Sequence, residues 1–274
     1  MFGVVVVGIG IVGSVRIRDI LNPLQSSPSE SLKLIGFVSR RKLDRFNNAK
    51  QIELDEALKS KDIDAAFICT DNQNHEESIR NFLKAGKHIL VEYPMALSAD
   101  AAYDLWRLAE QKGKVLHVEH IELLTEEYKQ QKKEVQGKKL VEGVLHFTGG
   151  HLDENLSGFP SFSGIARLSW LVDLFGDLTL TAHFLTAENR PLTWVEERAP
   201  GMKRDKHIHF SFTTGILDTL PPSSRASVGP FMQDQNLFAK KLLGQVTREE
   251  LLAEKQRILK CINLAEEIKK KCEP

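Results

Sequence analysis

Residues 2–13, FGVVVVGIGIVG, join an apolar run to a glycine-rich turn. The apolar run is rich in valine, which predicts a strand buried on both faces. Gly8, Gly10 and Gly13 follow it, and residues 14–21 are predicted to form a helix. A helix that begins at such a turn presents free N–H groups to phosphate oxygens. The order of strand, GxGxxG turn and helix therefore indicates a dinucleotide-binding domain rather than a glycine-rich turn without a ligand.

The composition is that of a globular protein without a charge bias. The 274 residues include 37 basic and 37 acidic side chains, and 42% are hydrophobic. A chain of this length is expected to form two domains, and its balanced charge predicts no nucleic-acid partner. No run approaches the roughly 18 apolar residues of a membrane span, and no signal peptide precedes the first strand. We therefore expect a cytoplasmic protein with no membrane partner.

The three cysteines favour a reducing compartment, because Cys69, Cys261 and Cys272 are too few and too scattered for a disulfide framework. Cys261 and Cys272 lie on one predicted helix, about 16 Å apart at roughly 1.5 Å per residue. That distance is too long for a shared ion, and we predict no metal site.

The end of the second predicted strand is where a Rossmann domain selects its cofactor. Residues 32–38, LKLIGFV, form this strand, and Ser39, Arg40 and Arg41 follow it. An acidic residue here would bind the ribose 2′-hydroxyl of NAD, whereas a hydroxyl followed by arginines suits the 2′-phosphate of NADP. The pattern favours NADPH, with NADH as a second possibility. The alternative is a pair of solvated arginines after a strand.

Strands and helices alternate through the first 120 residues. Beyond residue 38, strands are predicted at 64–69, 88–92 and 115–118, and helices at 76–85 and 99–112. This alternation is typical of a doubly wound parallel sheet in the α/β class. We predict an NADP(H)-binding Rossmann domain over residues 1–120.

Residues 121–274 follow a different pattern. Strands are predicted at 141–148, 178–184, 192–195 and 207–213, and helices at 122–136, 164–175 and 247–271. Polar and apolar residues alternate in these strands, as in an antiparallel sheet with one exposed face. We predict a substrate-binding α+β domain over residues 121–274, with a mainly antiparallel sheet and a C-terminal helix.

The order of these parts resembles the glucose-fructose oxidoreductase, inositol dehydrogenase and MocA family over nearly the whole chain. That family carries a Thr-x-x-x-x-His element and a Glu-Lys-Pro motif, which correspond here to residues 70–75 and 92–94. Tyr93 stands where the family has its catalytic lysine. Ala166 and Trp170 stand where the sugar dehydrogenases carry Asp and His. The acid–base set that takes a proton from a sugar hydroxyl is therefore absent.

These departures resemble the biliverdin reductases, as do the stretches LIGFVSRR, AGKHILVEYPMALS and FPSFSGIARLSWLVDLFG. The resemblance implies a cytosolic oxidoreductase of heme catabolism that reduces biliverdin to bilirubin with NADPH or NADH. It implies hydride transfer to the central methine carbon of the tetrapyrrole. We expect a monomer. Relatives carry more residues between Phe184 and Leu192, where this chain is short for two strands.

The resemblance places Glu92 and Tyr93 beside the nicotinamide. Tyr93 would donate a hydrogen bond to a lactam oxygen or pack on the ring, and the alternative is a structural Tyr-Pro turn. Arg167 lies on an otherwise apolar helix face near the family's catalytic histidine. It would stabilise developing charge, bind a propionate or relay a proton, and the alternative is a surface arginine. Guanidinium is a weak acid, which favours electrostatic and orienting roles for Arg167.

Tyr93 and Arg167 are the expected catalytic residues, and Glu119, Glu122 and Arg167 are expected to contact the substrate. The residues expected to bind the cofactor are Gly8, Ile9, Gly10, Ile11, Val12, Gly13, Ser39, Arg40, Arg41, Cys69, Thr70, Asn74, His75, Glu92 and Tyr93. Three further cations, Lys203, Arg204 and Arg225, are either propionate partners or solvated loop residues.

Two other functions stay open from the sequence. A sugar or polyol dehydrogenase of the same family would require a lysine before Pro94 and an Asp/His pair near Arg167. A non-catalytic NADP(H)-binding sensor or scaffold would bind the cofactor and turn over nothing.

Overall fold

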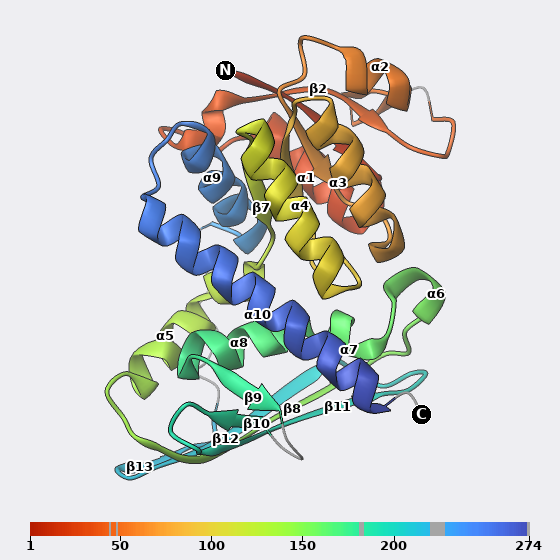
Figure 1. Ribbon diagram of the computed structural model, residues 1–274. Helices are drawn as coiled ribbons and strands as arrows, with labels where there is room; N and C mark the ends of the chain where they lie inside the picture. Colours follow the sequence, from red (N-terminus) through yellow and green to blue (C-terminus); the bar gives the residue numbers. More distant parts are fainter. Residues whose placement is uncertain (44, 48, 181–183, 220–227, 273–274) are drawn as a thin grey trace. The chain divides into compact units, whose positions relative to one another are not determined.

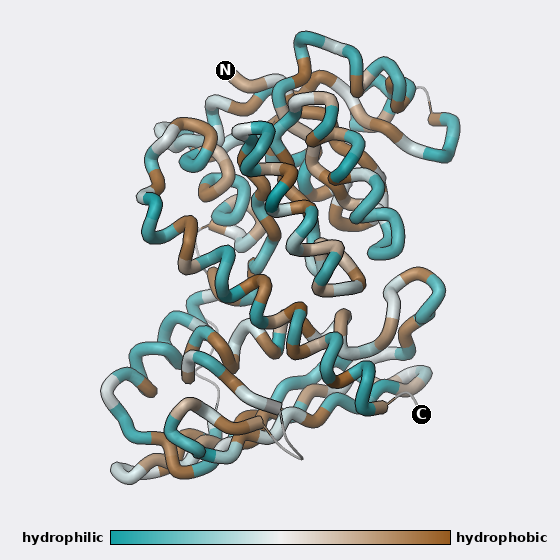
Figure 2. The backbone as a smooth tube through the Cα atoms, viewed as in Figure 1, coloured by the Kyte–Doolittle hydropathy of each residue, from teal (hydrophilic) through white to brown (hydrophobic). Residues whose placement is uncertain are grey.

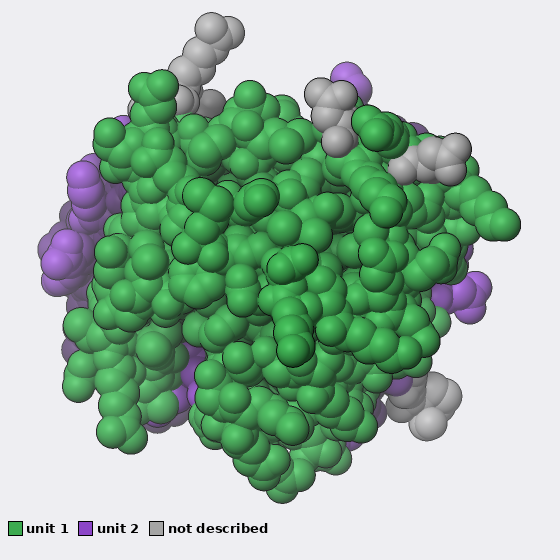
Figure 3. Space-filling model, turned by 90° about the horizontal axis from the view of Figure 1, so that it is seen from above, with its two compact units in different colours: residues 1–121, 228–254 green, residues 122–227, 255–274 purple. Residues whose placement is uncertain are grey.

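The computed structural model (Figure 1) describes residues 1–43, 45–47, 49–180, 184–219 and 228–272. The chain divides into two compact units, which have different colours in Figure 3. Unit 1 comprises Met1–Ile121 and Val228–Glu254, and unit 2 comprises Glu122–Ser227 and Lys255–Pro274. The sequence analysis placed residues 121–274 in one domain, whereas this division assigns Val228–Glu254 to the unit that contains the N-terminal sheet.

Unit 1 is built on a five-stranded parallel sheet. Its strands, in the order β2-β1-β5-β6-β7, are β1 (Phe2–Val7), β2 (Leu32–Val38), β5 (Ala65–Ile68), β6 (His88–Val91) and β7 (Leu116–Val118). Val4, Val5 and Val6 point alternately to the two faces of the sheet, and all three are fully buried. Both faces are therefore covered, and the predicted Rossmann architecture is confirmed.

The described part of unit 1 contains four longer helices and several short elements. The longer ones are α1 (Ile11–Leu21), α3 (His75–Lys84), α4 (Ala99–Lys112) and α9 (Pro230–Leu242). Shorter elements are η1 (Pro28–Ser31), β3 (Arg45–Phe46), β4 (Ala49–Lys50), α2 (Leu54–Lys59) and η2 (Asn72–Asn74). In α4, the Ser98 hydroxyl accepts a hydrogen bond from the Ala101 N–H, and Gly113 ends the helix with a φ of 60°.

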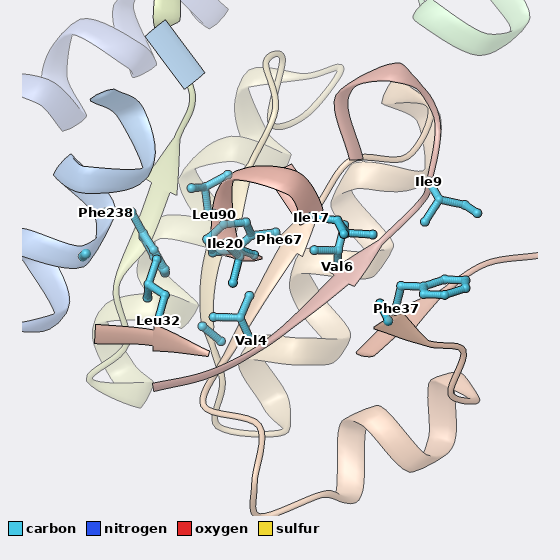
Figure 4. Close-up of a cluster of buried hydrophobic side chains, with 13 residues drawn as sticks. Val4, Val6, Ile9, Ile17, Ile20, Leu32, Phe37, Phe67, Leu90 and Phe238 are labelled. Atoms are coloured by element: carbon cyan, nitrogen blue, oxygen red, sulfur yellow. The ribbon is translucent and has the colours of Figure 1, made fainter. Parts of the chain in front are cut away.

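Helix α9 completes the core of unit 1, although it follows the last strand of the sheet by more than a hundred residues. Figure 4 shows Ile17 and Ile20 of α1 and Phe238 of α9 among the side chains of the sheet. The Phe238 ring lies edge-on to Phe67 of β5, with 5.3 Å between the ring centroids. Phe238 and Phe67 are both fully buried. This packing explains why residues 228–254 group with the N-terminal sheet and not with the sequence that precedes them.

Unit 2 contains a six-stranded sheet with one parallel pair. Its strands, in the order β13-β12-β8-β11-β10-β9, are β8 (Leu140–Gly149), β9 (Leu178–Leu180), β10 (Phe184–Thr186), β11 (Pro191–Arg198), β12 (Asp205–Phe212) and β13 (Gly215–Leu217). Only β8 and β11 pair in parallel; the other pairs are antiparallel, as predicted. In β12, Ile208 and Phe210 are buried while His207 and His209 are exposed.

The helices of unit 2 include α5 (Glu126–Val135), α6 (Glu154–Ser157), α7 (Pro160–Ser163) and α8 (Ile165–Phe175), and η3 (Ile121–Leu124) spans the division between the units. All residues of α8 from Ile165 to Val172 are buried. Helix α8 is therefore a central part of the core of unit 2.

The last helix, α10 (Arg248–Cys272), is amphipathic, and hydrophobic and hydrophilic residues alternate along it (Figure 2). At its start, the Thr247 N–H donates to Glu250 Oε2 at 2.8 Å and the Glu250 N–H donates to Thr247 Oγ1 at 3.2 Å. This reciprocal pair is a capping box. None of the helices in the described ranges is long and apolar enough to cross a bilayer.

Candidate active site

The turn between β1 and α1 has the space that a pyrophosphate requires. A Cβ on Gly13 would lie 2.0 Å from the carbonyl oxygen of Gly8, so the helix and the turn pack closely there. Gly8 itself has a φ of 91°, which favours glycine. A Cβ on Gly10, the N-cap of α1, would meet no atom within 4 Å. Gly10 also supplies no side chain to cap the first N–H groups of α1. These residues fit a bound dinucleotide.

The apolar residues of the same turn differ in exposure. Ile9 is buried, Val12 is partly buried, and Ile11 is 88% exposed on the first turn of α1. Ile11 therefore adds an exposed apolar surface beside the N-terminus of α1, and such a surface suits an apolar part of a bound cofactor.

The residues that follow β2 lie beside this turn. Arg41 Nη2 donates to the carbonyl oxygen of Ile9 at 3.1 Å, and the Arg41 N–H donates to Ser39 Oγ at 3.1 Å. Arg40 Nη2 donates to Asp71 Oδ2 at 3.0 Å, and the Arg40 side chain is 89% exposed. The structure thus brings Ser39, Arg40 and Arg41 together with the glycine turn. No carboxylate stands at the end of β2 to bind a ribose 2′-hydroxyl.

His75 joins two backbone segments at the carboxyl end of the sheet. Its Nδ1 lies 2.8 Å from the carbonyl oxygen of Pro94, and its Nε2 lies 2.9 Å from that of Thr70. The side chain is fully buried, and this burial lowers the pKa of the imidazole. Asn74 is the N-cap residue of α3, which begins at His75, and its side chain makes no capping hydrogen bond. His75 therefore holds the Thr70 and Pro94 segments, and both ring nitrogens are already occupied.

Glu92, at the end of β6, is held by a fully buried arginine that the sequence analysis did not single out. Arg16 Nε donates to Glu92 Oε1 at 2.9 Å, and Arg16 Nη2 donates to Asp234 Oδ2 at 2.7 Å. Arg16 Nη1 donates to the Phe231 carbonyl at 3.1 Å. The other oxygen of Asp234 lies 2.9 Å from His117 Nε2. Arg16 thus binds two carboxylates, that of Glu92 after β6 and that of Asp234 on α9.

Glu119 is a buried carboxyl group beside Glu92. Burial raises its pKa well above the ordinary value, and the nearby charge of Glu92 raises it further. Burial also raises the pKa of Glu92, but Arg16 opposes this increase. Glu119 is hydrogen-bonded to Glu92, so the two carboxyl groups titrate as a pair. The Ile121 N–H donates to Glu119 Oε1 at 2.5 Å, and the Cys69 thiol donates to Glu92 Oε1 at 3.9 Å.

Replacing Glu119 by glutamine is expected to make stability less sensitive to pH. A glutamine keeps an acceptor for the Ile121 N–H and a donor toward Glu92. The folded pKa of Glu119 lies above its ordinary value of 4.5, so folding takes up a proton between the two values. Below the ordinary value of 4.5, the group contributes its full stabilisation. Above it, this contribution falls by about 1.4 kcal/mol per pH unit until the pH reaches the folded pKa. Thermal unfolding from pH 5 to pH 8 should show a shallower decline for Glu119→Gln, and parallel curves for the two proteins would contradict the assignment.

Tyr93 is partly buried in unit 1, next to the Glu92 network. Its ring is nearly parallel to that of His120, with an interplanar angle of 7° and 6.4 Å between the centroids. The peptide bond between Tyr93 and Pro94 is cis. The sequence motif thus becomes a tight turn that presents an aromatic ring beside Glu92.

In unit 2, Arg167 is buried and fixed in orientation. Its side chain is 2% exposed, so the surface-arginine alternative is wrong. Its Nη2 donates to both carboxylate oxygens of Glu196, at 2.9 and 3.1 Å, and to the Ser163 carbonyl at 2.9 Å. The guanidinium lies over the Phe147 ring, 4.2 Å from the centroid. Burial inside α8 and these contacts hold Arg167 in one position.

Glu122 binds two further cations in unit 2. Arg204 Nη2 donates to Glu122 Oε1 at 2.7 Å, and Lys206 Nζ donates to Oε2 at 3.2 Å. Burial alone would raise the pKa of Glu122, but the charges of Lys206, Arg167 and Arg204 lower it below its ordinary value. The structure thus places Glu122 and Glu119 in different units, and their pKa shifts are opposite: the pKa of Glu122 is lowered and that of Glu119 is raised. Arg225 lies outside the described residues.

Sequence reasoning missed Arg16, Asp234, Glu196, Arg198 and Lys206. A signal existed for two of them. Arg16 lies four residues before Ile20 on the buried face of α1, and Glu196 is in phase with the buried Leu192 on β11. A charged residue on a buried face requires a partner. No local pattern links Arg16 to Asp234, which is 218 residues away. Among the described residues, no group of three or more His, Cys, Asp or Glu side chains could hold a metal ion.

Two family models match the chain. Residues 2–120 match the oxidoreductase family with an NAD-binding Rossmann fold, and residues 128–182 and 179–224 match the catalytic domain of biliverdin reductase. Over 99% of its length the chain is 52% identical to biliverdin reductase A of Homo sapiens, of which 96% is covered. The chain belongs to the biliverdin reductase family. Biliverdin reductase A of Mus musculus is 51% identical over 99% of this chain and 96% of its own length.

The fold of this biliverdin reductase family member is also found in a distant relative. A biliverdin reductase from Synechocystis sp. PCC 6803, solved in complex with biliverdin and NADP+, has a TM-score of 0.81 with 18% identity, over 99% of both chains. The alignment with the Homo sapiens protein spans 287 positions, more than the 274 residues of this chain. The two matched parts of the catalytic-domain model meet at residues 179–182, close to the segment that the sequence analysis expected to be short.

Proposed function

We propose that the chain reduces biliverdin to bilirubin by hydride transfer from NADPH, with NADH as a second cofactor. The observation that carries this proposal is the 52% identity with a biliverdin reductase A over 99% of the chain. The proposal is supported by the absence of the general base that oxidation of a sugar hydroxyl requires. The positions where the sugar dehydrogenases carry their Lys, Asp and His are occupied here by Tyr93, Ala166 and Trp170. Reduction of a methine bridge removes no proton from a hydroxyl group, so this absence does not matter.

The reaction adds a hydride to the central methine carbon, and a pyrrolic nitrogen gains a proton. When bound, NADPH supplies the hydride. The turn from Gly8 to Gly13 and the N-terminus of α1 bind the pyrophosphate, and Arg40 and Arg41 bind the 2′-phosphate. Glu92, held by Arg16, orients the nicotinamide. Tyr93 donates a hydrogen bond to a lactam oxygen or packs on the ring. We further propose that the chain acts as a monomer in the cytoplasm.

Arg167 acts by its charge and not as an acid, because a guanidinium group barely releases its proton. Electron density moves onto the tetrapyrrole as the hydride arrives, and a fixed cation stabilises it. The contacts with Glu196 and the Ser163 carbonyl fix that cation before the substrate binds. The proton then comes from water or from a propionate.

Replacing Arg167 by lysine is expected to lower kcat about a hundredfold while NADPH affinity stays unchanged. Lysine keeps the charge, but an ammonium group cannot both bind Glu196 and lie flat over the Phe147 ring as the planar guanidinium does. An effect of this size, about 2.7 kcal/mol, is that of losing one preorganised electrostatic contact. Steady-state kinetics with an NADPH-binding titration would measure both quantities. A kcat within twofold of the unmodified protein would rule out a catalytic role for Arg167.

NADPH consumption tests the proposed function against its alternatives. Biliverdin should trigger oxidation of NADPH, whereas myo-inositol and glucose with NADP+ should produce no reduction of the cofactor. Turnover of a polyol would favour the sugar dehydrogenase. NADPH binding without turnover of any of the three would favour the sensor or scaffold.

A further inference from the structure

One face of the unit 2 sheet carries a group of cations around a single phenyl ring. Phe147 on β8 pairs with Glu196 on β11 and with Lys206 on β12, so the three residues form one row across the sheet. Arg198 lies two residues beyond Glu196 and therefore faces the same side. We call Arg167, Arg198, Arg204, Lys206, Glu122, Glu196 and Phe147 the cationic cluster.

Aromatic rings hold the cations of this cluster. The guanidinium carbons of Arg167, Arg198 and Arg204 lie 4.2, 5.1 and 5.7 Å from the centroid of Phe147. Lys206 Nζ lies 3.5 Å from a ring centroid of Trp170 on α8. Such contacts stabilise a cation and leave its N–H groups free for other acceptors. The cluster therefore gathers donors beyond those that its own anions use.

The carboxylates of the cluster do not balance its cations. Glu196 accepts hydrogen bonds from Arg167 and Arg198, the latter at 2.6 Å, and Glu122 accepts from Arg204 and Lys206. Four cations thus share two contacting carboxylates. The negative charge of Glu127 also acts on Lys206. A surplus of positive charge on a largely apolar floor favours a ligand that carries carboxylates.

One donor of the cluster has no acceptor. Arg167 Nε is buried, and no hydrogen-bond partner for it exists among the residues that the structure describes. Buried donors in folded proteins are almost always paired, so an unpaired one requires an explanation. A ligand that brings an acceptor to this cluster would provide it.

The exposure of the four cations separates their roles. Arg167 is 2% exposed and committed to Glu196, whereas Lys206 and Arg198 are 16% and 18% exposed and Arg204 is 67% exposed. Arg167 therefore has little freedom to turn toward a flexible propionate. The other three present charge at the accessible edge of the cluster.

We propose that Arg198, Arg204 and Lys206 bind the two propionates of the tetrapyrrole, while Glu196 and Glu122 hold these cations in place beforehand. This inference rests on the proposed function, because it takes biliverdin as the substrate. These three residues of the sheet and its connection then recognise the substrate's carboxylates, and Arg167 acts on the conjugated ring system of the tetrapyrrole. Preorganised cations lose little side-chain freedom on binding, which increases their contribution to affinity.

The test compares biliverdin with its dimethyl ester, which has no negative charge on either side chain. Calorimetry would give the dissociation constants, and steady-state assays would give KM and kcat for both compounds. The ester should bind at least tenfold more weakly than biliverdin. Arg198→Gln and Lys206→Gln should each weaken biliverdin binding about tenfold, and the more exposed Arg204→Gln about threefold, without changing the affinity for the ester. Lys139→Gln, an exposed cation of unit 2 outside the cluster, should change neither affinity.

The ester separates recognition from a purely structural role. Variants that lose the same affinity for biliverdin and for the ester would overturn the inference, since the lost contact could not be with a carboxylate. Equal affinity of the unmodified protein for both compounds, with both reduced, would overturn this inference and leave the proposed function intact. Absence of any binding or reduction of biliverdin would overturn the proposed function and this inference with it.

Discussion

Arg16→Met should destabilise the protein by about 3–5 kcal/mol, the cost of leaving a buried charge without its partner. Arg16 is fully buried and donates to Glu92, Asp234 and the Phe231 carbonyl. Methionine fills much of the same volume but provides no donor. Glu92 would then lose its cationic partner, whereas Asp234 would keep its contact with His117. Chemical denaturation at neutral pH would measure the change.

Arg107 on α4 provides a control in the same unit. Its side chain is 69% exposed and pairs at 2.8 Å with Asp104, which is 50% exposed. Exposed pairs contribute about 0–1 kcal/mol, so Arg107→Met should cost little. Equal losses for Arg16→Met and Arg107→Met would contradict the buried network.

The pH dependence of Arg16→Met distinguishes loss of a counter-ion from loss of packing. Burial and the charge of Asp234 raise the pKa of Glu92, and loss of Arg16, which opposes this increase, would raise it further. A group with a raised pKa contributes stability at low pH that is lost as the pH rises. The destabilisation should therefore be smaller at pH 5 than at pH 8. A pH-independent loss would indicate a packing defect.

Gly10→Val should weaken NADPH binding at least about a hundredfold with only a small effect on folding. An added Cβ at Gly10 meets no protein atom within 4 Å, and the backbone there, with φ −68° and ψ −161°, accepts a β-branched residue. The side chain would instead fill the space in front of the α1 N-terminus and block two or more N–H bonds to phosphate. Each such charge-assisted bond is worth about 1.5–3 kcal/mol. A fluorescence titration with NADPH would measure the affinity.

Gly13→Ala separates ligand space from packing space in the same turn. Its Cβ would lie 2.0 Å from the carbonyl oxygen of Gly8, so the turn and α1 must move apart. This variant should lose thermal stability, whereas Gly10→Val should unfold within a few degrees of the unmodified protein. NADPH binding that survives Gly10→Val would place the pyrophosphate elsewhere.

The features that could be predicted from the sequence are those that depend on local patterns of residues. The GxGxxG turn, the run of buried strands and the alternation in β8 and β12 each arise from residues close together in the chain, and the sheets of both units confirm them. The role of α9 could not be predicted in this way. Its Phe238 packs against Phe67, and its Asp234 binds Arg16, through contacts that join distant parts of the sequence.

The candidate site shows the same distinction. Arg167 was singled out as a charge on an apolar helix, and the structure shows its side chain buried. Its partner Glu196 and its neighbour Arg198 became visible only through the register of β8 and β11. Likewise, Glu119 and Glu122 are three residues apart in sequence, yet their opposite pKa shifts depend on which charges the fold brings to each.

The fate of a labelled hydride tests the central claim most directly. Biliverdin would be incubated with the protein and NADPH that carries deuterium at both C4 positions, followed by absorbance and mass spectrometry. We predict that the long-wavelength biliverdin band is replaced by the shorter-wavelength band of bilirubin, and that the product carries one deuterium at the central methylene bridge. NADPH that binds while the biliverdin spectrum stays unchanged, or bilirubin without deuterium at that carbon, would contradict the account.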